Sequence, residues 1–169
     1  MYSRLADLEK ILDVESKKLG EFQYRITHTS SAAEKFDLEV RIEHEILPSI
    51  RKYEREYWDI LVQEAPSCEV IENDARNAIV KVVTKVELIQ IQPNKYSDEL
   101  MQKLQEILDK LNEPQTPAAA KLRAALPLIP GIMSYEVELD TENSLKRVFE
   151  GIRQLLRNTI KKTTTTECR

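Results

Sequence analysis

Few side chains in this sequence are suited to metal or redox chemistry. It contains two histidines, His28 and His44, and two cysteines, Cys68 and Cys168. Neither histidine has a second type of ligand at a metal-binding spacing, because the glutamates on either side of His44 lie on different faces of a predicted helix. The cysteines lie too far apart for a metal motif and are too few for a disulfide scaffold, which favours a reducing compartment. We therefore expect no metal and no cofactor.

The residue sets for nucleophilic and acid–base catalysis are also missing. His28 lies in the segment HTSSAAE, but no nucleophile elbow surrounds it, so a Ser-His-Asp triad is not predicted. Glu43 and Glu45 stand two residues apart, so on a helix they point to different sides and cannot act on one substrate. Only three glycines occur, whereas loops that cradle phosphates usually need glycine for positive φ. The sequence predicts no catalytic residues and a protein that is not an enzyme.

Aromatic and basic side chains interleave over residues 51–58, as they do on many surfaces that bind nucleic acid. The set is Arg51, Lys52, Tyr53, Arg55, Tyr57 and Trp58. Tyr53 and Tyr57 are four residues apart on the apolar face of a predicted helix, and nearby carboxylates offset the bases. We therefore favour packing of these aromatic rings in a core over binding of nucleic acid, with Trp58 as an anchor in either case.

The last predicted helix, which begins at Thr141 or Asn143, has a basic face opposite its apolar face. The basic residues are Lys146, Arg147, Arg153, Arg157, Lys161 and Lys162. Basic residues near a helix C-terminus interact favourably with the helix dipole without any partner, and the apolar side is needed for the core. Binding to a membrane surface or to nucleic acid is therefore the alternative hypothesis, through Arg147, Arg153, Arg157 and Lys161.

Composition limits the remaining possibilities. The chain has 169 residues, of which 41% are hydrophobic and 32% charged, as in a globular protein that carries a helical appendage. The net charge of -4 provides no general attraction to nucleic acid or anionic lipid. The N-terminus, MYSRLADLEK, lacks the apolar segment of a secretory signal, and no apolar run approaches a membrane span. We expect a cytoplasmic protein.

The elements that position these residues begin with a helical hairpin over residues 1–64. Apolar residues at spacings of three and four predict a coiled-coil helix from Ser3 to about Thr27 and a second helix from about Ala32 to Gln63. Pro48 predicts a kink or break near Ile46 and Leu47, since proline has no amide hydrogen and clashes with the preceding turn. The loop between the helices is short, so we expect them to pack antiparallel as a coiled coil.

The rest of the chain predicts a small two-layer α/β sandwich over residues 65–162, followed by a disordered tail over residues 163–169. Strands are expected at 69–71, at 78–92 with a bulge near Glu87, and at 133–140. Helices are expected at 97–111, where Ser97 is the N-cap, and at 117–126, which Pro127 and Pro130 end. The predicted fold class is therefore α+β.

Two segments carry a resemblance to a known family. Residues 5–58, which begin LADLEKILDVESKKLG, resemble the coiled-coil hairpins beside bacterial effector-associated adaptor domains. The segment LPLIPGIMSYEVELDTENSLKRVFEGIRQLL resembles the strand-helix pattern of small α+β domains in bacterial conflict systems, including those compared with the TRADD N-terminal fold. The resemblance implies an adaptor in an immunity pathway that recruits effectors, such as caspase-like peptidases, or signalling ATPases. It assigns no site residue.

We therefore predict a protein-interaction adaptor that self-associates as a homo-oligomer and binds protein partners. The heptad-patterned hairpin, the sheet edges expected of a small domain and the basic last helix are its candidate contact surfaces. The candidate interaction residues are Leu5, Leu8, Leu12, Leu19, Phe22, Tyr53, Tyr57, Trp58, Arg147, Arg153 and Arg157.

Overall fold

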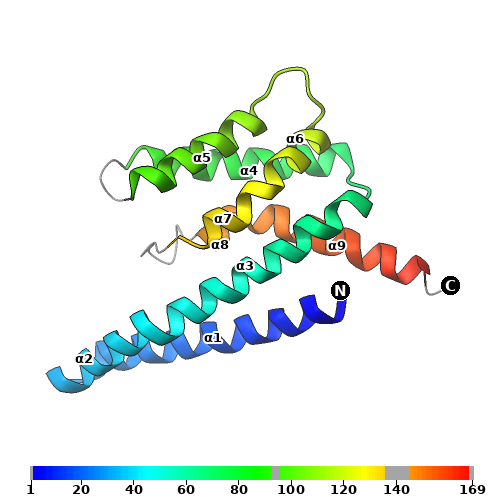
Figure 1. Ribbon diagram of the computed structural model, residues 1–169. Helices are drawn as coiled ribbons and strands as arrows, with labels where there is room; N and C mark the ends of the chain where they lie inside the picture. The colour runs from blue at the N-terminus through cyan, green and yellow to red at the C-terminus, as the bar shows by residue number, and fades with distance from the viewer. Residues whose placement is uncertain (1, 93–95, 136–144, 168–169) are drawn as a thin grey trace. The chain divides into compact units, whose positions relative to one another are not determined.

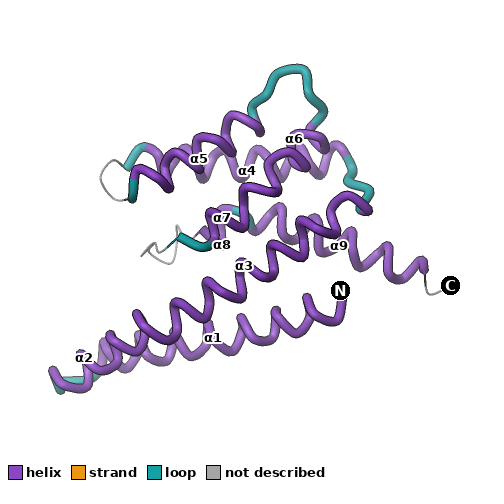
Figure 2. Tube along the Cα trace, in the orientation of Figure 1, coloured by secondary structure: helices purple, strands orange, loops and turns teal. Residues whose placement is uncertain are grey.

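The computed structural model describes residues 2–92, 96–135 and 145–167. All regular secondary structure in these residues is helical (Figures 1 and 2). The predicted α+β class and the α/β sandwich are therefore wrong: the described residues form an all-α protein, with no strand among them. The chain divides into two compact units, Met1–Tyr57 and Trp58–Arg169. This division falls inside a helix that itself ends at Glu64, the end predicted for the hairpin.

The first unit is a helical hairpin, as the apolar spacing predicted (Figure 1). Helix α1 spans Tyr2–His28, α2 spans Ala32–Arg41, and α3 begins at Leu47 and runs to Glu64. A cluster of apolar side chains from both arms forms its core. These residues are Phe22, Leu38 and Ile46, with Leu19, Ile26, Ile42 and Ile50 packed against them.

Polar pairs between the two arms show that they are antiparallel. Arg4, near the start of α1, lies 2.7 Å from the carboxylate of Glu56 in α3. The hydroxyl of Tyr57 also donates to Glu9, at 2.8 Å. At the other end of the hairpin, Arg25 near the end of α1 lies 3.0 Å from Glu34 in the first turn of α2. At the turn, Ser31 caps α2 by accepting a hydrogen bond of 3.2 Å from the amide of Glu34. The hairpin is thus held both by its core and by pairs at each end.

Pro48 is accommodated by a π-helical turn rather than by a break in the helix. The turn, η1, covers Ile42–Ile46 and directly precedes α3. In it the amide of Leu47 donates to the carbonyl of Ile42, five residues back. An α-helical register would direct the Pro48 ring against the carbonyl four residues back, where proline also lacks a hydrogen to donate. A wider turn at this point is the kind of local adjustment that such a clash produces.

Helix α4, Glu72–Gln90, occupies the segment in which the strand at 78–92 was predicted. Its buried residues recur at the three- and four-residue spacing of one helix face, with Ala78 and Ile79 both on that face. They are Ala75, Ala78, Ile79, Val82, Val86 and Ile89. The broken alternation that suggested a bulge near Glu87 is thus the signature of a helix, and burial of this face outweighs the modest preference of β-branched residues for strands. Glu72 and Asp74 in the first turn also favour a helix N-terminus.

The other predicted strands are not present where the structure can be described. Residues 69–71 form an extended connection into α4 without pairing to another segment. Met133, the first residue of the strand predicted at 133–140, ends the short helix α7, Ile129–Met133. Residues 136–140, like the predicted helix start at Thr141 or Asn143, lie outside the described residues.

Helices α5 and α6 confirm the helices predicted around them. Helix α5 spans Asp98–Leu111, and the Ser97 side chain accepts a hydrogen bond of 3.2 Å from the amide of Leu100. Helix α6 spans Ala118–Ala125. The prolines that follow do not end the helical path: Pro127 and Pro130 each stand at a first or second helical position, in the 3₁₀ turn η3 (Leu126–Leu128) and in α7. Proline is tolerated there because those amides have no intrahelical acceptor.

Two further helices complete the second unit. Helix α8 spans Leu145–Val148 and α9 spans Glu150–Glu167. The disordered tail predicted from residue 163 is corrected over residues 163–167, which continue α9. Within this unit α4 is central, packing against α5, α6, α8 and α9. Trp58 meets the ring of Phe149 edge to face, with centroids 6.2 Å apart.

Candidate functional site

One side of α4, together with its C-cap residue Ile91, carries a row of exposed residues that are apolar except for Thr84. We call Val80, Thr84, Leu88 and Ile91 the α4 face. Val80 is 59% exposed, Leu88 50% and Ile91 70%. At 100° of rotation for each residue these positions fall within an arc of about 80°, so they form one continuous strip. The hydroxyl of Thr84 is turned back onto the carbonyl of Val80, at 2.8 Å, which removes a hydroxyl donor from the strip.

Two lysines border the α4 face along one edge. The stem of Lys81 lies beside Gly151 of α9, where an added Cβ would sit 3.8 Å from the lysine Cδ. The Nζ of Lys85 donates to the carbonyl of Arg147, at 2.9 Å, at the end of α8. Neither lysine forms an ion pair in the part of the chain that the structure describes. The α4 face is therefore a largely apolar strip with two lysines along one edge and Glu87 along the other, so its border carries net positive charge.

A second apolar strip lies on the hairpin, exposed at Ala33 and Phe36 and half-buried at Val40. We call Ala33, Phe36 and Val40 the α2 face. Phe36 is 68% exposed, while Leu38 on the other side of α2 is buried in the hairpin core. Carboxylates border this face: Asp37 on one edge, Glu39 on the other, and Glu43 at its C-terminal end. None of these three carboxylates forms an ion pair with a described residue.

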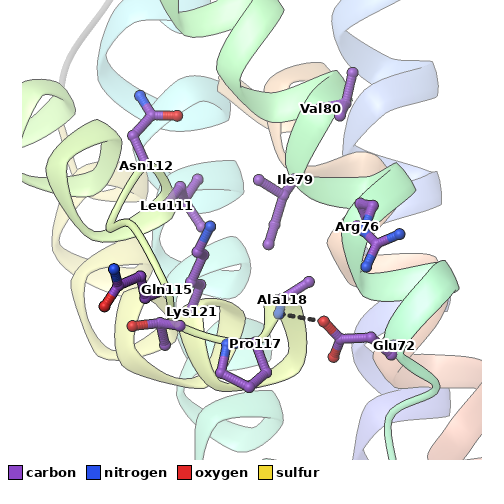
Figure 3. A pocket seen from close by; sticks show the side chains of 11 residues that line it. Glu72, Arg76, Ile79, Val80, Leu111, Asn112, Gln115, Pro117, Ala118 and Lys121 are labelled. Atoms are coloured by element: carbon purple, nitrogen blue, oxygen red, sulfur yellow. Dashed lines mark hydrogen bonds between the residues drawn. The ribbon is translucent and has the colours of Figure 1, made fainter.

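An open hollow of about 830 Å³ lies between α4, the end of α5 and the start of α6 (Figure 3). Its carboxylate, Glu72, points at the first turn of α6 and accepts hydrogen bonds from the amides of Ala118 and Ala119, the latter at 3.1 Å. These two amides lower the pKa of Glu72 below its ordinary value. Arg76 and Lys121 line the same hollow. Glu72 is thus engaged as a cap that ties α4 to α6, which explains its position without a ligand.

Most of the interaction residues proposed from sequence are buried within the chain. Leu5, Leu8, Leu12, Phe22, Tyr57 and Trp58 are each less than a tenth exposed, while Leu19 and Tyr53 are half-buried. Tyr57 and Trp58, at 0% and 1% exposure, do not offer ring faces on which bases could stack. The role of these residues in partner binding stays a prediction.

The basic residues proposed for the last helix do not form one exposed patch. Arg153 and Arg157 are buried, at 9% and 7% exposure, whereas Arg147 is exposed. The two buried guanidinium groups are not available to phosphates, so Arg147 and Lys161 are the exposed members of the proposed set. The geometry therefore gives no particular support to the alternative hypothesis.

Cys68 is the described cysteine, and its environment is that of a structural thiol. Its Sγ lies 3.3 Å from the carbonyl of Glu64, and its own carbonyl accepts a hydrogen bond of 2.9 Å from Arg123. Burial raises the pKa of the thiol, with a further contribution from the Glu64 carboxylate. Among the described residues no cluster of three or more histidine, cysteine or acidic side chains could hold a metal ion. None of the described helices has the length and apolar character needed to cross a membrane.

The α4 and α2 faces were both missed at the level of sequence. Assigning residues 78–92 to a strand hid the fact that Val80, Leu88 and Ile91 share one side. On the hairpin, a usable signal was present, because Phe36 falls outside the apolar series that Leu38 begins. A large aromatic residue off the buried series of an amphipathic helix indicates a second contact.

Comparison with known proteins adds no relative: no family model, no curated protein and no solved structure matches the chain.

Proposed function

We propose that this protein is a non-enzymatic adaptor that binds a helix of a partner protein on the α4 face. The observation that carries the proposal is the row formed by Val80, Leu88 and the C-cap residue Ile91, all exposed along one side of α4. Single exposed apolar residues are ordinary on protein surfaces, but a contiguous row on one element is typical of an interaction site. A helix presents such a row to the apolar side of another amphipathic helix.

The charges beside the α4 face specify the partner further. Lys81 and Lys85 border it without an ion pair in the described chain, so a partner helix with carboxylates along one edge gains two attractive contacts. A helix with lysines in the same places would be repelled. The ligand class is therefore an acidic amphipathic helix.

The resemblance of residues 5–58 to hairpins beside effector-associated adaptor domains suggests what such a partner is. It points to an effector or a signalling ATPase of a bacterial immunity pathway. The hairpin supports this part of the proposal. The second segment of the resemblance implied an α+β domain, and the all-helical fold of the described residues removes that support.

Binding to a designed peptide tests the proposal. The probe is a fluorescent helical peptide with a stripe of leucine and phenylalanine bordered by glutamates. The control is a basic peptide of the same design, with lysines in place of the glutamates. We expect the acidic peptide to bind and the basic one not to, with affinity that weakens as salt rises. Leu88→Lys should weaken binding by about tenfold or more, since it places a charge in the middle of the apolar contact.

A charge swap provides the matched control. The variant Lys81→Glu, Lys85→Glu should reverse the preference, so that the basic peptide binds and the acidic one does not. Val14→Lys, at an exposed apolar position of α1 outside both faces, should bind like the original protein. Equal binding of both peptides by all four proteins, or no binding by any, would rule the proposal out.

A further inference from the structure

The α2 face has the properties that the α4 face requires of a partner. It is apolar at Phe36, lies on a helix, and is bordered by Asp37, Glu39 and Glu43. Over residues 32–46 the chain has five acidic and two basic residues, whereas the charged residues beside the α4 face are Lys81 and Lys85 on one edge and Glu87 on the other. The two faces therefore carry opposite net charge around exposed apolar residues. Opposite charge at the rim of an apolar contact favours the matched pair over other partners.

We propose that the α2 face of one copy of this protein docks on the α4 face of another copy. This inference rests on the proposed function, because it identifies the acidic helix that the α4 face binds as part of the same chain. Phe36 enters the apolar strip formed by Val80 and Leu88, and the carboxylates beside it meet Lys81 and Lys85. The buried aromatic ring is the residue type that most often anchors such contacts.

The charges also determine the symmetry of the assembly. A contact of the α2 face with another α2 face would bring carboxylates together, and a contact between two α4 faces would bring lysines together. Both symmetric contacts are therefore disfavoured. The contact that remains joins two different surfaces, so each added copy leaves one free α2 face and one free α4 face. Such a contact continues into a chain of copies, unless the assembly closes as a ring or as a pair in which each copy docks its α2 face on the α4 face of the other.

Two single variants and their mixture test this geometry. Phe36→Asp disables the α2 face alone, and Leu88→Lys disables the α4 face alone. Both positions are at least half exposed, so the fold should be retained, and circular dichroism of each variant checks this. By sedimentation equilibrium the original protein should increase in mass above that of one chain, to a closed pair or a larger assembly, as its concentration rises. Each variant alone should keep the mass of one chain, or associate at least about tenfold more weakly.

The decisive experiment is the mixture of the two variants. A Phe36→Asp chain still offers its α4 face and a Leu88→Lys chain still offers its α2 face, so an equimolar mixture should form a pair and stop there. Val14→Lys should assemble like the original protein. The inference would be overturned if either variant alone formed a dimer, or if the chains in the mixture stayed monomeric. It would also be overturned if the original protein kept the mass of one chain at every concentration.

The peptide experiment separates the two proposals. If the original protein stays monomeric but binds the acidic peptide, the adaptor function stands and docking between copies is wrong. If it neither assembles nor binds either peptide, both proposals fail.

Discussion

Two valines two residues apart give a direct test of the helical assignment of α4. Val82 is 0% exposed and Val80 is 59% exposed, because on a helix these positions point to different sides. In a strand they would point to the same side. Replacing each by alanine therefore separates the two structures by their effect on the free energy of unfolding.

The expected effects follow from burial. Valine to alanine removes two methyl groups, each worth about 0.8 kcal/mol when buried, and the cavity that is left adds to the cost. The better helix propensity of alanine offsets this loss of stability by up to about 0.7 kcal/mol. We expect Val82→Ala to lower the free energy of unfolding by about 1 to 2 kcal/mol. Val80→Ala loses no buried contact within the chain, so it should change stability by less than about 0.5 kcal/mol or raise it slightly.

Urea unfolding followed by circular dichroism measures both values. The protein concentration must be low enough that the unfolding midpoint does not depend on it, so that association between copies does not contribute. Equal losses of stability in the two variants would refute the helix and favour the strand that the β-branched composition suggested.

Three further predictions concern titration and reactivity. The pKa of Glu72 lies below its ordinary value of 4.5, so its contribution to stability is present above that value and is lost as the pH falls through the lower folded pKa. Glu72→Gln should therefore make urea stability less sensitive to acid, and an unchanged acid profile would argue against the cap on α6. A hydrogen bond to the Glu99 carboxylate raises the pKa of Tyr135 to about 12, so this tyrosine should stabilise the fold below the ordinary pKa of 10.0 and lose that contribution as the pH rises through the folded value. Glu99→Gln should return the ultraviolet titration of Tyr135 toward 10.0, and no movement would contradict the contact. Cys68 should resist iodoacetamide in the folded protein and react once urea unfolds it, as read by peptide mass spectrometry, because burial raises the pKa of its thiol; equal rates in both states would exclude a buried thiol.

The hairpin and α5 could be predicted from sequence because local signals agree there. Apolar residues follow the helical period in α1, α2, α3 and α5, and a serine stands at the N-terminus of both α2 and α5. Pro48 correctly indicated a disturbance of the helix, but sequence could not show that a π-helical turn would absorb it. That choice depends on how the residues before Pro48 pack in the hairpin core.

In α4 the local signals disagree. Residues 78–92 are rich in valine and isoleucine, which favour strands, yet their buried positions follow the period of a helix. The polar residues before them were interpreted as a turn, although Glu72 and Asp74 suit the first turn of a helix. Packing against helices distant in sequence, such as α6 and α9, decides in favour of a helix. The candidate surface lies on this helix, so predicting a strand here also meant that the surface was not recognised.

The α4 face is tested most directly by backbone-amide chemical shifts of the isotope-labelled protein as the acidic helical peptide is added. We expect the changes to gather at Val80, Lys81, Leu88 and Ile91 and to disappear in the Leu88→Lys variant. Changes that gather instead on the hairpin unit, or spectra that do not change at all, would contradict an adaptor that binds through α4.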